Sequence, residues 1–416
     1  MVRNSTHSAI VDGKKALRDS IADAILFFDV TEQVEAERWL LRESIAGLIG
    51  ERRMNGTTFP LRALGNSDLR LSPIGLGTSV LGGGNWRYSL GPQSDSQSIA
   101  AIHCALDLGI NWLDSAGLYG LGHSEELIAR ALQSSPHKPY IFTKCSSRWR
   151  EDGTMYNSLK ADSLTEELEG SLRRLKVDTI DLYQVHWPDP ESEIEEGWEQ
   201  LARLREQGKI RWIGVSNFSV KQMKRAQKIA PITSLQPPYS IVRRHIEAEI
   251  LPFAREMGIG VISYAPMQSG LLTGNMTVES IASLPANDCR REMNEFYEPR
   301  LSRNLRLVEL LREIGNAHEV SPGVVAVAWT LHHPAITGTL VGCRSAREVE
   351  GLAPALRFRL SQDEYERICR FVRSIGWYLS LIYGRIAPVS GAKIENFDCC
   401  NHESCTRSRT ESVGPL

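Results

Sequence analysis

The sequence predicts an α/β protein whose main part is a (β/α)8 TIM barrel, and three observations support this prediction. Short apolar runs of β type alternate with amphipathic helical stretches from about residue 74 to about residue 353. Eight such strand–helix repeats occur, which is the number that closes a barrel of parallel strands. Polar residues stand where several strands end, as expected at the active end of such a barrel.

Segments at both ends of the chain do not follow this alternation. Residues 1–55 are charged and helix-prone, so we expect a helical or poorly ordered extension there. The barrel is expected over residues 56–373, and residues 374–416 are expected to form an irregular, poorly ordered tail. An alternative is that the native protein comprises the barrel alone. Before the first strand, LRALGNSDLRLS carries turn residues at 65–68 and predicts a β-hairpin.

Each predicted strand is a short apolar run that ends near turn residues. The eight strands are Ile74–Ser79, Asn111–Ser115, Tyr140–Lys144, Ile180–His186, Ile210–Ser216, Ser234–Gln236, Val261–Ala265 and Thr339–Gly342. The predicted helices are Ser96–Leu108, Ser124–Leu132, Leu164–Leu175, Glu196–Gln207, Val220–Ile229, His245–Met257, a region Asn304–His332 broken near Pro322, and Ala346–Ala353. A further helix is expected in LSQDEYERICRFVRSI, which closes the barrel region.

A doubly wound open sheet is the alternative to a barrel. That fold would place G-x-G-x-x-G where the first strand enters a helix, but valine occupies the third glycine position in Gly75-Leu-Gly77-Thr-Ser-Val80. No Walker A sequence occurs either, because the run Gly82-Gly83-Gly84 is followed by Asn-Trp and not by Lys-Ser/Thr. The strict strand–helix alternation therefore favours the barrel.

Composition and charge argue against several classes of partner. The 416 residues carry a formal net charge of -2, and no basic run stands out, so we expect neither a nucleic-acid nor a membrane partner. Eight cysteines without a framework spacing, and an N-terminus without a signal-peptide pattern, predict a cytoplasmic protein. The cysteines and histidine within residues 399–405 match no standard zinc spacing, so no metal site is expected. Nothing in the sequence indicates an oligomeric state.

Four polar residues form the candidate catalytic site. Asp114, Lys144 and His186 end consecutive predicted strands, and Tyr119 lies in the Gly-rich loop after the first of them. Each residue alone has a common structural explanation, such as a helix cap, a solvated lysine or a satisfied histidine. Their order along the chain points to function, because the ends of parallel barrel strands converge on one mouth.

Together these side chains suit proton transfer. A free tyrosine has a pKa of about 10, too high for ready proton exchange at neutral pH. A lysine cation beside Tyr119 would favour the phenolate, and Asp114 could keep Lys144 charged and oriented. A neutral His186 could donate a hydrogen bond to a substrate carbonyl oxygen. The set would then protonate an alkoxide as it forms.

Four motifs in order, LDSAGLYGLGHSEE, YIFTKC, DLYQVHWPDP and GKIRWIGVSNFS, resemble the signatures of the aldo-keto reductase family of NADP(H)-dependent barrels. The resemblance covers about residues 61–370. It implies that Tyr119 is the general acid/base, that Lys144 and Asp114 tune it, and that His186 orients the carbonyl. The implied reaction is hydride transfer between NADP(H) and a carbonyl or alcohol.

The resemblance also implies where the cofactor binds. The nicotinamide carboxamide would be held by Ser216, Asn217 and Gln236, and Tyr264 would stack on the nicotinamide ring. The phosphates would lie over the loops after strands seven and eight, where this fold often binds phosphate. Those loops supply Met267, Ser269, Gly270, Leu271, Gly342 and Arg344. Of these, the fork of Arg344 is the candidate for the adenosine 2′-phosphate.

The chain departs from the family pattern just after Arg344. Glu348 stands where the family usually has glutamine or arginine, and Leu352 stands where it has asparagine. A carboxylate near a 2′-phosphate is unfavourable, and leucine makes no hydrogen bond to the adenine. NADP(H) is therefore the favoured cofactor, and NAD(H) is the alternative.

The substrate side of the site is expected to be aromatic. Trp86, Trp187 and Tyr156 lie in loops at the same barrel mouth and would form the walls of a pocket. Such walls suit an aldehyde, a ketone or a sugar over a highly charged substrate. The alternative function, from a different class, is a nicotinamide-binding regulatory or scaffold subunit with little turnover.

Overall fold

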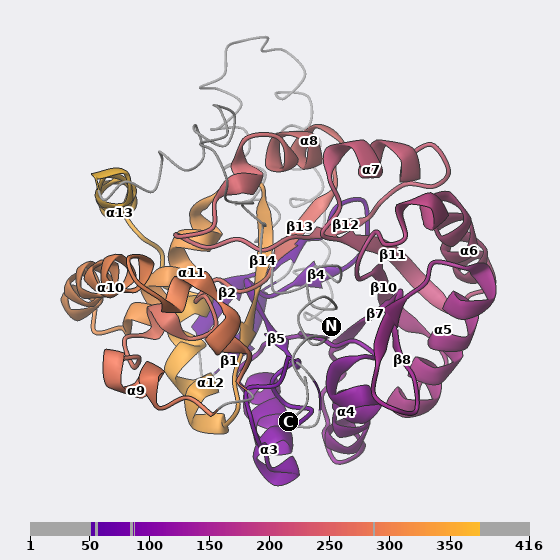
Figure 1. Cartoon of the computed structure of the whole chain (residues 1–416), viewed down its shortest axis with the longest axis horizontal. Coiled ribbons are helices and arrows are strands. Elements are labelled where there is room, and N and C mark those ends of the chain that lie inside the picture. The colour runs from indigo at the N-terminus through magenta and orange to yellow at the C-terminus, as the bar shows by residue number, and fades with distance from the viewer. Residues whose placement is uncertain (1–50, 55–56, 84–85, 87, 286–287, 375–416) are drawn as a thin grey trace, which may run out of the picture. The chain divides into compact units, whose positions relative to one another are not determined.

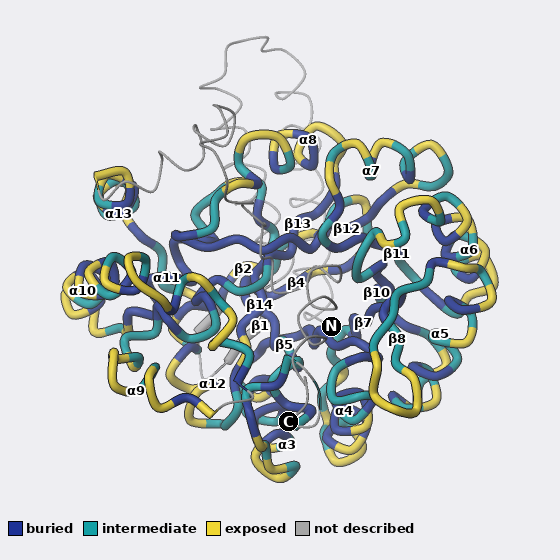
Figure 2. Tube along the Cα trace, in the orientation of Figure 1, coloured by how far each residue is buried: buried dark blue, intermediate teal, exposed yellow. Residues whose placement is uncertain are grey.

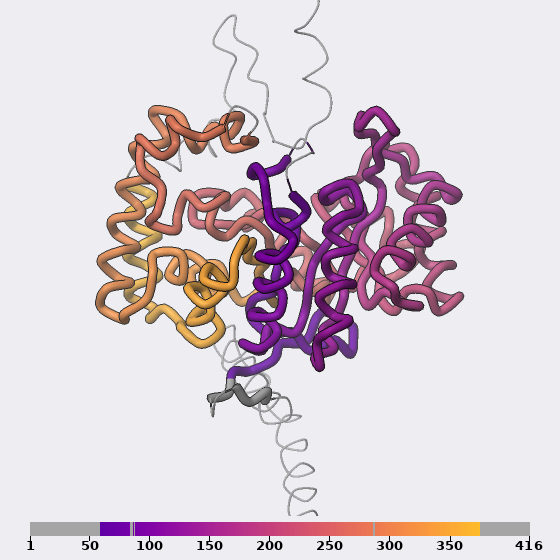
Figure 3. Tube along the Cα trace, turned by 90° about the horizontal axis from the view of Figure 1, so that it is seen from below, coloured from indigo at the N-terminus to yellow at the C-terminus, as the bar shows by residue number. Residues whose placement is uncertain are grey.

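The computed structural model describes residues 51–54, 57–83, 86, 88–285 and 288–374. Within them, eight parallel strands form a closed barrel in the order β5-β6-β7-β10-β11-β12-β13-β14, with β14 paired to β5. Helices surround these strands in Figure 1, and Figure 3 shows the same arrangement from another side. The predicted (β/α)8 barrel is confirmed, and the closed sheet rules out the doubly wound alternative.

All eight strands lie where the sequence predicts them, and their ends differ by no more than three residues. They are β5 (Ile74–Gly77), β6 (Trp112–Asp114), β7 (Tyr140–Cys145), β10 (Ile180–Val185), β11 (Ile210–Ser216), β12 (Ser234–Gln236), β13 (Gly260–Ser263) and β14 (Ile336–Gly342). Strand β13 ends before the predicted Ala265, which has a φ of 57° and has left the extended conformation. The strands therefore share one carboxyl edge, where the candidate site lies.

The predicted helices are also present. They are α3 (Asp95–Asp107), α4 (His123–Gln133), α5 (Ala161–Leu175), α6 (Ile194–Glu206), α7 (Val220–Ala226), α8 (Ile250–Glu256), α10 (Arg300–Ala317), α11 (Pro322–His332), α12 (Ala346–Leu352) and α13 (Gln362–Ser374). The predicted helix His245–Met257 is divided into a 3-10 turn and α8, and Pro252 lies in the first turn of α8, where its missing N–H costs little. The break near Pro322 is confirmed, and Ser321 caps α11 by accepting the Val324 N–H at 3.3 Å.

A β-hairpin closes the amino end of the barrel, as predicted. Its strands are β3 (Arg62–Ala63) and β4 (Arg70–Leu71), and Gly65 has a φ of 50° at the turn. Side chains of the hairpin share one buried apolar cluster with inward residues of the barrel, namely Leu64, Leu69, Leu71, Trp112, Phe142, Leu182, Ile262 and Leu340. This cluster, here called the leucine plug, fills the barrel below the site.

Three further elements were not predicted. β1 (Glu51–Met54) and β2 (Thr57–Pro60) form a two-stranded sheet, and β8 (Ser147–Trp149) pairs with β9 (Met155–Asn157) in a second one. The short helix α9 (Val278–Ala282) belongs to the long connection between β13 and α10. The expected N-terminal extension, C-terminal tail and cysteine cluster lie at residues 1–50 and 375–416, outside the described residues.

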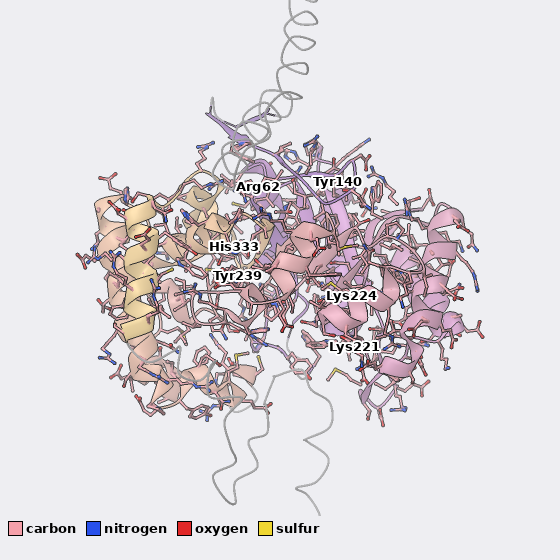
Figure 4. All side chains as sticks on the ribbon, turned by 90° about the horizontal axis from the view of Figure 1, so that it is seen from above. Arg62, Tyr140, Lys221, Lys224, Tyr239 and His333 are labelled. Carbon is pink, nitrogen blue, oxygen red and sulfur yellow. The ribbon has the colours of Figure 1, made fainter. Side chains whose placement is uncertain are left out.

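Burial follows the expected two-layer plan of the barrel. In Figure 2 the barrel strands are mostly dark blue, and yellow lies mainly on the outward faces of the helices. Figure 4 shows Arg62 and Tyr140 toward one end of the barrel and Lys221, in the first turn of α7, toward the other. In the described part of the chain, no helix combines the length and apolar character needed to cross a membrane.

Candidate active site

The candidate tetrad, Asp114, Tyr119, Lys144 and His186, gathers at the carboxyl end of the barrel. Asp114 ends β6, Lys144 is the penultimate residue of β7, and His186 directly follows β10. Asp114, Tyr119 and His186 line a cavity of about 1100 Å³, and Lys144 lies behind them with its side chain fully buried. The structure therefore brings together the four residues that the sequence singles out.

Lys144 connects the acid to the phenol. Its Nζ contacts Asp114 Oδ1, donates to the Ser115 carbonyl at 2.8 Å and to Tyr119 Oη at 3.3 Å. These three acceptors use the three protons of the ammonium group. Asp114 is only 2% exposed, so a paired and hydrogen-bonded arrangement is what makes this buried charge tolerable.

The electrostatics keep Lys144 charged. Burial by itself would lower the pKa of Lys144, but the Asp114 carboxylate and then Tyr119 outweigh it and raise the pKa above its usual value. A cation 3.3 Å from Tyr119 Oη favours the phenolate over the phenol.

His186 is held neutral beside Tyr119. Burial of the ring, followed by the charge of Lys144, holds the pKa of His186 well below its usual value. The imidazole and Tyr119 rings meet edge to face, with centroids 5.7 Å apart. A neutral imidazole has one N–H to donate, so His186 can place a carbonyl oxygen next to Tyr119.

The loop that carries Tyr119 is fixed from behind. Arg174 Nε on α5 donates to the buried Glu125 of α4 at 2.8 Å, and Glu125 also accepts the Thr143 hydroxyl at 2.6 Å. Gly122 has a φ of 101°, and a Cβ there would lie 2.8 Å from Arg174 Cδ. A left-handed glycine therefore lets the arginine pass directly under the loop.

The residues implied for the nicotinamide form one hydrogen-bonded group on the cavity wall. Ser216 Oγ donates to the Gln236 carbonyl at 2.8 Å, and Asn217 Nδ2 lies 3.0 Å from Ser216 Oγ. Tyr264 Oη lies 3.0 Å from Asn217 Oδ1. All four line the cavity next to Asp114, where polar groups are available to an amide.

Most of the implied phosphate-binding residues also line the cavity. Met267, Ser269, Gly270, Gly342 and Arg344 face it. Leu271 is the exception, because its fully buried side chain packs with Phe296 and Leu301, as an apolar side chain in a long loop is expected to do.

Arg344, the candidate for the 2′-phosphate, is held by the loop of residues 90–93. Its guanidinium donates to Gln93 Oε1 at 2.9 Å, to the Leu90 carbonyl at 3.1 Å and to the Pro92 carbonyl. The Arg344 backbone N–H donates to Glu348 Oε2 at 2.9 Å, which places a carboxylate at the same end of the cavity. Three of the five guanidinium N–H groups are thus engaged, and part of the fork remains for an anion.

Aromatic side chains surround the tetrad, as expected. The ring of Trp86 is 5.6 Å from that of Tyr119, and Trp187 stacks on His186 at 6.3 Å. Tyr156 does not belong to this wall, because alternation along β9 turns its neighbours Met155 and Asn157 to the cavity. The Tyr156 ring instead lies 4.7 Å from the Arg150 guanidinium.

The sequence reasoning missed one polar neighbour of the tetrad. Gln184 on β10 is fully buried, and its Nε2 donates to Asp114 Oδ2 at 3.1 Å. A usable signal was present, because Gln184 lies two positions before His186 near the end of β10 and so shares its face.

Residues 73–373 match the family model described as the aldo/keto reductase family. The chain belongs to this family. The aldo-keto reductase YhdN of Bacillus subtilis is 35% identical over 309 residues, which cover 74% of this chain and 91% of the relative. The NADH-specific methylglyoxal reductase of Escherichia coli is 31% identical over 315 residues, covering 72% of this chain and 94% of the relative.

A solved structure agrees with these relatives. The glycerol dehydrogenase AKR11B4 from Gluconobacter oxydans superposes with a TM-score of 0.71 at 33% identity, over 80% of this chain and 99% of that one. Membership of the aldo/keto reductase family makes the chain a member of an oxidoreductase family in which hydride transfer to carbonyl groups is general.

Proposed function

We propose that the chain catalyses hydride transfer between NADP(H) and the carbonyl or alcohol group of an aldehyde, ketone or sugar. The observation that carries this proposal is the buried contact of Lys144 with both Asp114 and Tyr119 at the edge of the cavity. When bound, the nicotinamide supplies the hydride, which is added to the carbonyl carbon. The protein's own residues place the carbonyl and handle the proton.

In the reductive direction, His186 donates a hydrogen bond to the carbonyl oxygen and Tyr119 gives that oxygen a proton. The carbonyl carbon gains a hydride, its C=O π bond breaks, and the oxygen becomes a hydroxyl group. Lys144 stabilises the phenolate that remains, and Tyr119 is reprotonated from solvent. In the oxidative direction, the same phenolate removes the alcohol proton.

Support for a nicotinamide cofactor comes from the cavity wall. Ser216, Asn217 and Gln236 offer amide and hydroxyl groups beside Asp114, and Ser269 and Arg344 line the same cavity. NADP(H) is the first choice because Arg344 keeps free guanidinium N–H groups. The fixed carboxylate of Glu348 opposes a 2′-phosphate, which is why NAD(H) is the alternative. Fluorescence titration with NADPH and with NADH decides between them.

The substitution Tyr119→Phe tests the proposal. General acid–base catalysis contributes roughly 10²–10⁴-fold, so kcat should fall by that order while the dissociation constant for the cofactor stays within about twofold. Tyr156→Phe, which removes a hydroxyl group outside the cavity, is the matched control and should keep normal turnover.

Turnover is measured on a panel of aldehydes, ketones and sugars. Near-normal turnover of Tyr119→Phe would contradict the mechanism. Tight cofactor binding without turnover of any substrate by the unchanged chain would favour the regulatory or scaffold role.

A further inference from the structure

Asp114 has a second set of partners that the proton-transfer scheme does not use. While Oδ1 faces Lys144, Oδ2 accepts hydrogen bonds from Gln184 Nε2 at 3.1 Å and from Gln236 Nε2 at 2.8 Å. Gln236 Nε2 also lies 3.3 Å from Gln184 Oε1. An ionised carboxylate carries no proton, so both amides must turn their nitrogen atoms toward it. This requirement fixes the orientation of both glutamines.

These three side chains form a polar group inside the barrel. Asp114, Gln184 and Gln236 come from the alternate strands β6, β10 and β12, the arrangement by which this fold fills an interior layer. Such layers are dominated by bulky apolar residues. Gln184 is fully buried, and burying an amide is costly unless it is hydrogen-bonded. Methionine would fill the same space without this cost, so the presence of an amide indicates that its hydrogen bonds have a role.

The neighbouring strands leave room for this contact. Gln184 pairs in register with Lys144 on β7 and with Gly214 on β11. A Cβ at Gly214 would lie 3.3 Å from Gln184 Cγ and 2.1 Å from Ser234 Oγ. Gln236 lines the cavity, whereas Gln184 lies behind it. Gln184 can therefore act on the reaction only through Asp114 and Gln236.

We propose that Gln184 is a positioning residue for proton transfer, whose amide holds Asp114 Oδ2 and Gln236 together so that Asp114 Oδ1 stays on Lys144. This inference rests on the proposed function, in which Tyr119 exchanges the proton. By donating to Asp114, Gln184 withdraws negative charge from the carboxylate and leaves more of the Lys144 charge to act on Tyr119.

The titratable groups around this point are the four members of the candidate tetrad and the Cys145 thiol, which lies 3.5 Å from the Gln184 carbonyl and whose pKa burial raises well above its usual value. During alcohol oxidation Tyr119 must be ionised to accept the proton, so kcat rises with pH through an apparent pKa of the site. In Gln184→Met, that apparent pKa should move upward by about one pH unit, the order expected for one hydrogen bond to a charged group. Below this pKa, kcat should fall about tenfold.

Two readouts separate this role from a structural one. The dissociation constants for NADPH and NADH should change by less than about twofold in Gln184→Met, since Gln184 does not face the cavity. Gln200→Met is the matched control, because this half-buried glutamine of α6 donates to Thr165 at 2.9 Å on the outer layer. Its pH profile should coincide with that of the unchanged chain.

A second variant, Gln184→Glu, keeps the shape of the side chain. Its protonated carboxyl group can donate to Asp114 Oδ2, whereas its ionised form repels Asp114. The ratio of its kcat to that of the unchanged chain should therefore be highest at low pH and decline as pH rises. This variant also decides the question if Gln184→Met does not fold.

An unshifted pH profile in Gln184→Met, with or without a lower kcat, overturns the inference and leaves Gln184 a packing residue. A pH-independent ratio for Gln184→Glu does the same. Both tests of Gln184 require that Tyr119→Phe has been found inactive, as the proposed function expects. Normal turnover of Tyr119→Phe would instead overturn the proposed function.

Discussion

Two buried ion pairs lie within the same part of the barrel and differ in what surrounds them. In the first, Lys144 contacts Asp114 and also reaches the Tyr119 hydroxyl at the cavity. In the second, Arg174 binds the fully buried Glu125 under the loop of Tyr119, away from the cavity wall. Both pairs neutralise a carboxylate that is almost completely buried.

The difference between these pairs lies in the cation. A lysine ammonium is a compact charge with three protons, and the third acceptor of Lys144 is the group proposed to react. Arginine is a rigid fork that stays charged, and Arg174 uses its fork to join α4 to α5 and to carry the Trp149 ring at 5.9 Å. We infer that the first pair serves the reaction and the second serves the fold.

The largest effect is expected when the Lys144–Asp114 pair is broken. Lys144→Met removes the cation from Tyr119, so kcat should fall by about 10²–10⁴-fold, the usual contribution of acid–base catalysis. Steady-state kinetics on a substrate of the unchanged chain measures it. Lys221→Met, an exposed lysine of α7, is the control (Figure 4). A loss below tenfold would contradict the role assigned to Lys144.

A smaller effect should follow when the second pair is broken. Arg174→Met leaves Glu125 buried without its cation, and removal of one partner from a buried pair costs about 3–5 kcal/mol. Since the Arg174 side chain is 24% exposed, we expect the lower end, about 3 kcal/mol, in the free energy of unfolding by urea. Arg173→Met, an exposed neighbour, is the control. If kcat falls while the free energy of unfolding stays unchanged, the pair serves the reaction and not the fold.

The smallest effect, measured per pH unit, concerns Glu167, a half-buried carboxyl group for which no ion pair is found among the described residues. Burial raises the pKa of Glu167 to about 8, and the positive charge of Arg148 only partly offsets this rise. Between about pH 4.5 and 8 the unfolded chain has lost this proton and the folded chain keeps it, so stability declines as pH rises. One group contributes at most about 1.4 kcal/mol per pH unit.

Glu167→Gln removes this titration. The free energy of unfolding should then fall less steeply between pH 5 and 8 than in the unchanged chain, roughly the interval set by the two pKa values. Chemical denaturation at several pH values measures the slope, with Glu166→Gln, an exposed neighbour, as control. Equal slopes in both variants would show that Glu167 is ionised in the folded protein.

Much of the fold was predictable, because strand and helix periods are local signals. All eight barrel strands and the break before Pro322 were found in this way. The hairpin β8–β9 was not, since its two strands have three residues each and carry little periodicity. The same short strands explain the error at Tyr156, because the face of a strand changes with every residue.

The positions of site residues at strand ends were predictable from the sequence. The hydrogen-bond partners of their side chains were less predictable. The order of Asp114, Lys144 and His186 sufficed to place them at one edge. Arg344 gives three of its donors to the loop of residues 90–93. Arg344 and Gln93 are 251 residues apart, and no local pattern in the sequence predicts such a contact. The alternation along β10 could have shown that Gln184 shares the face of His186, but not that its amide reaches Asp114 on β6.

The leucine plug has a consequence for the way the proton returns to Tyr119. Leu64, Leu69 and Leu71 are fully buried and fill the amino end of the barrel with apolar side chains. In the proposed reaction, we expect each proton that Tyr119 gives away to be replaced through the cavity, by which substrate would arrive and product would depart. Supply of the proton and exchange of the reactants would then share one opening, so a bound product would delay both.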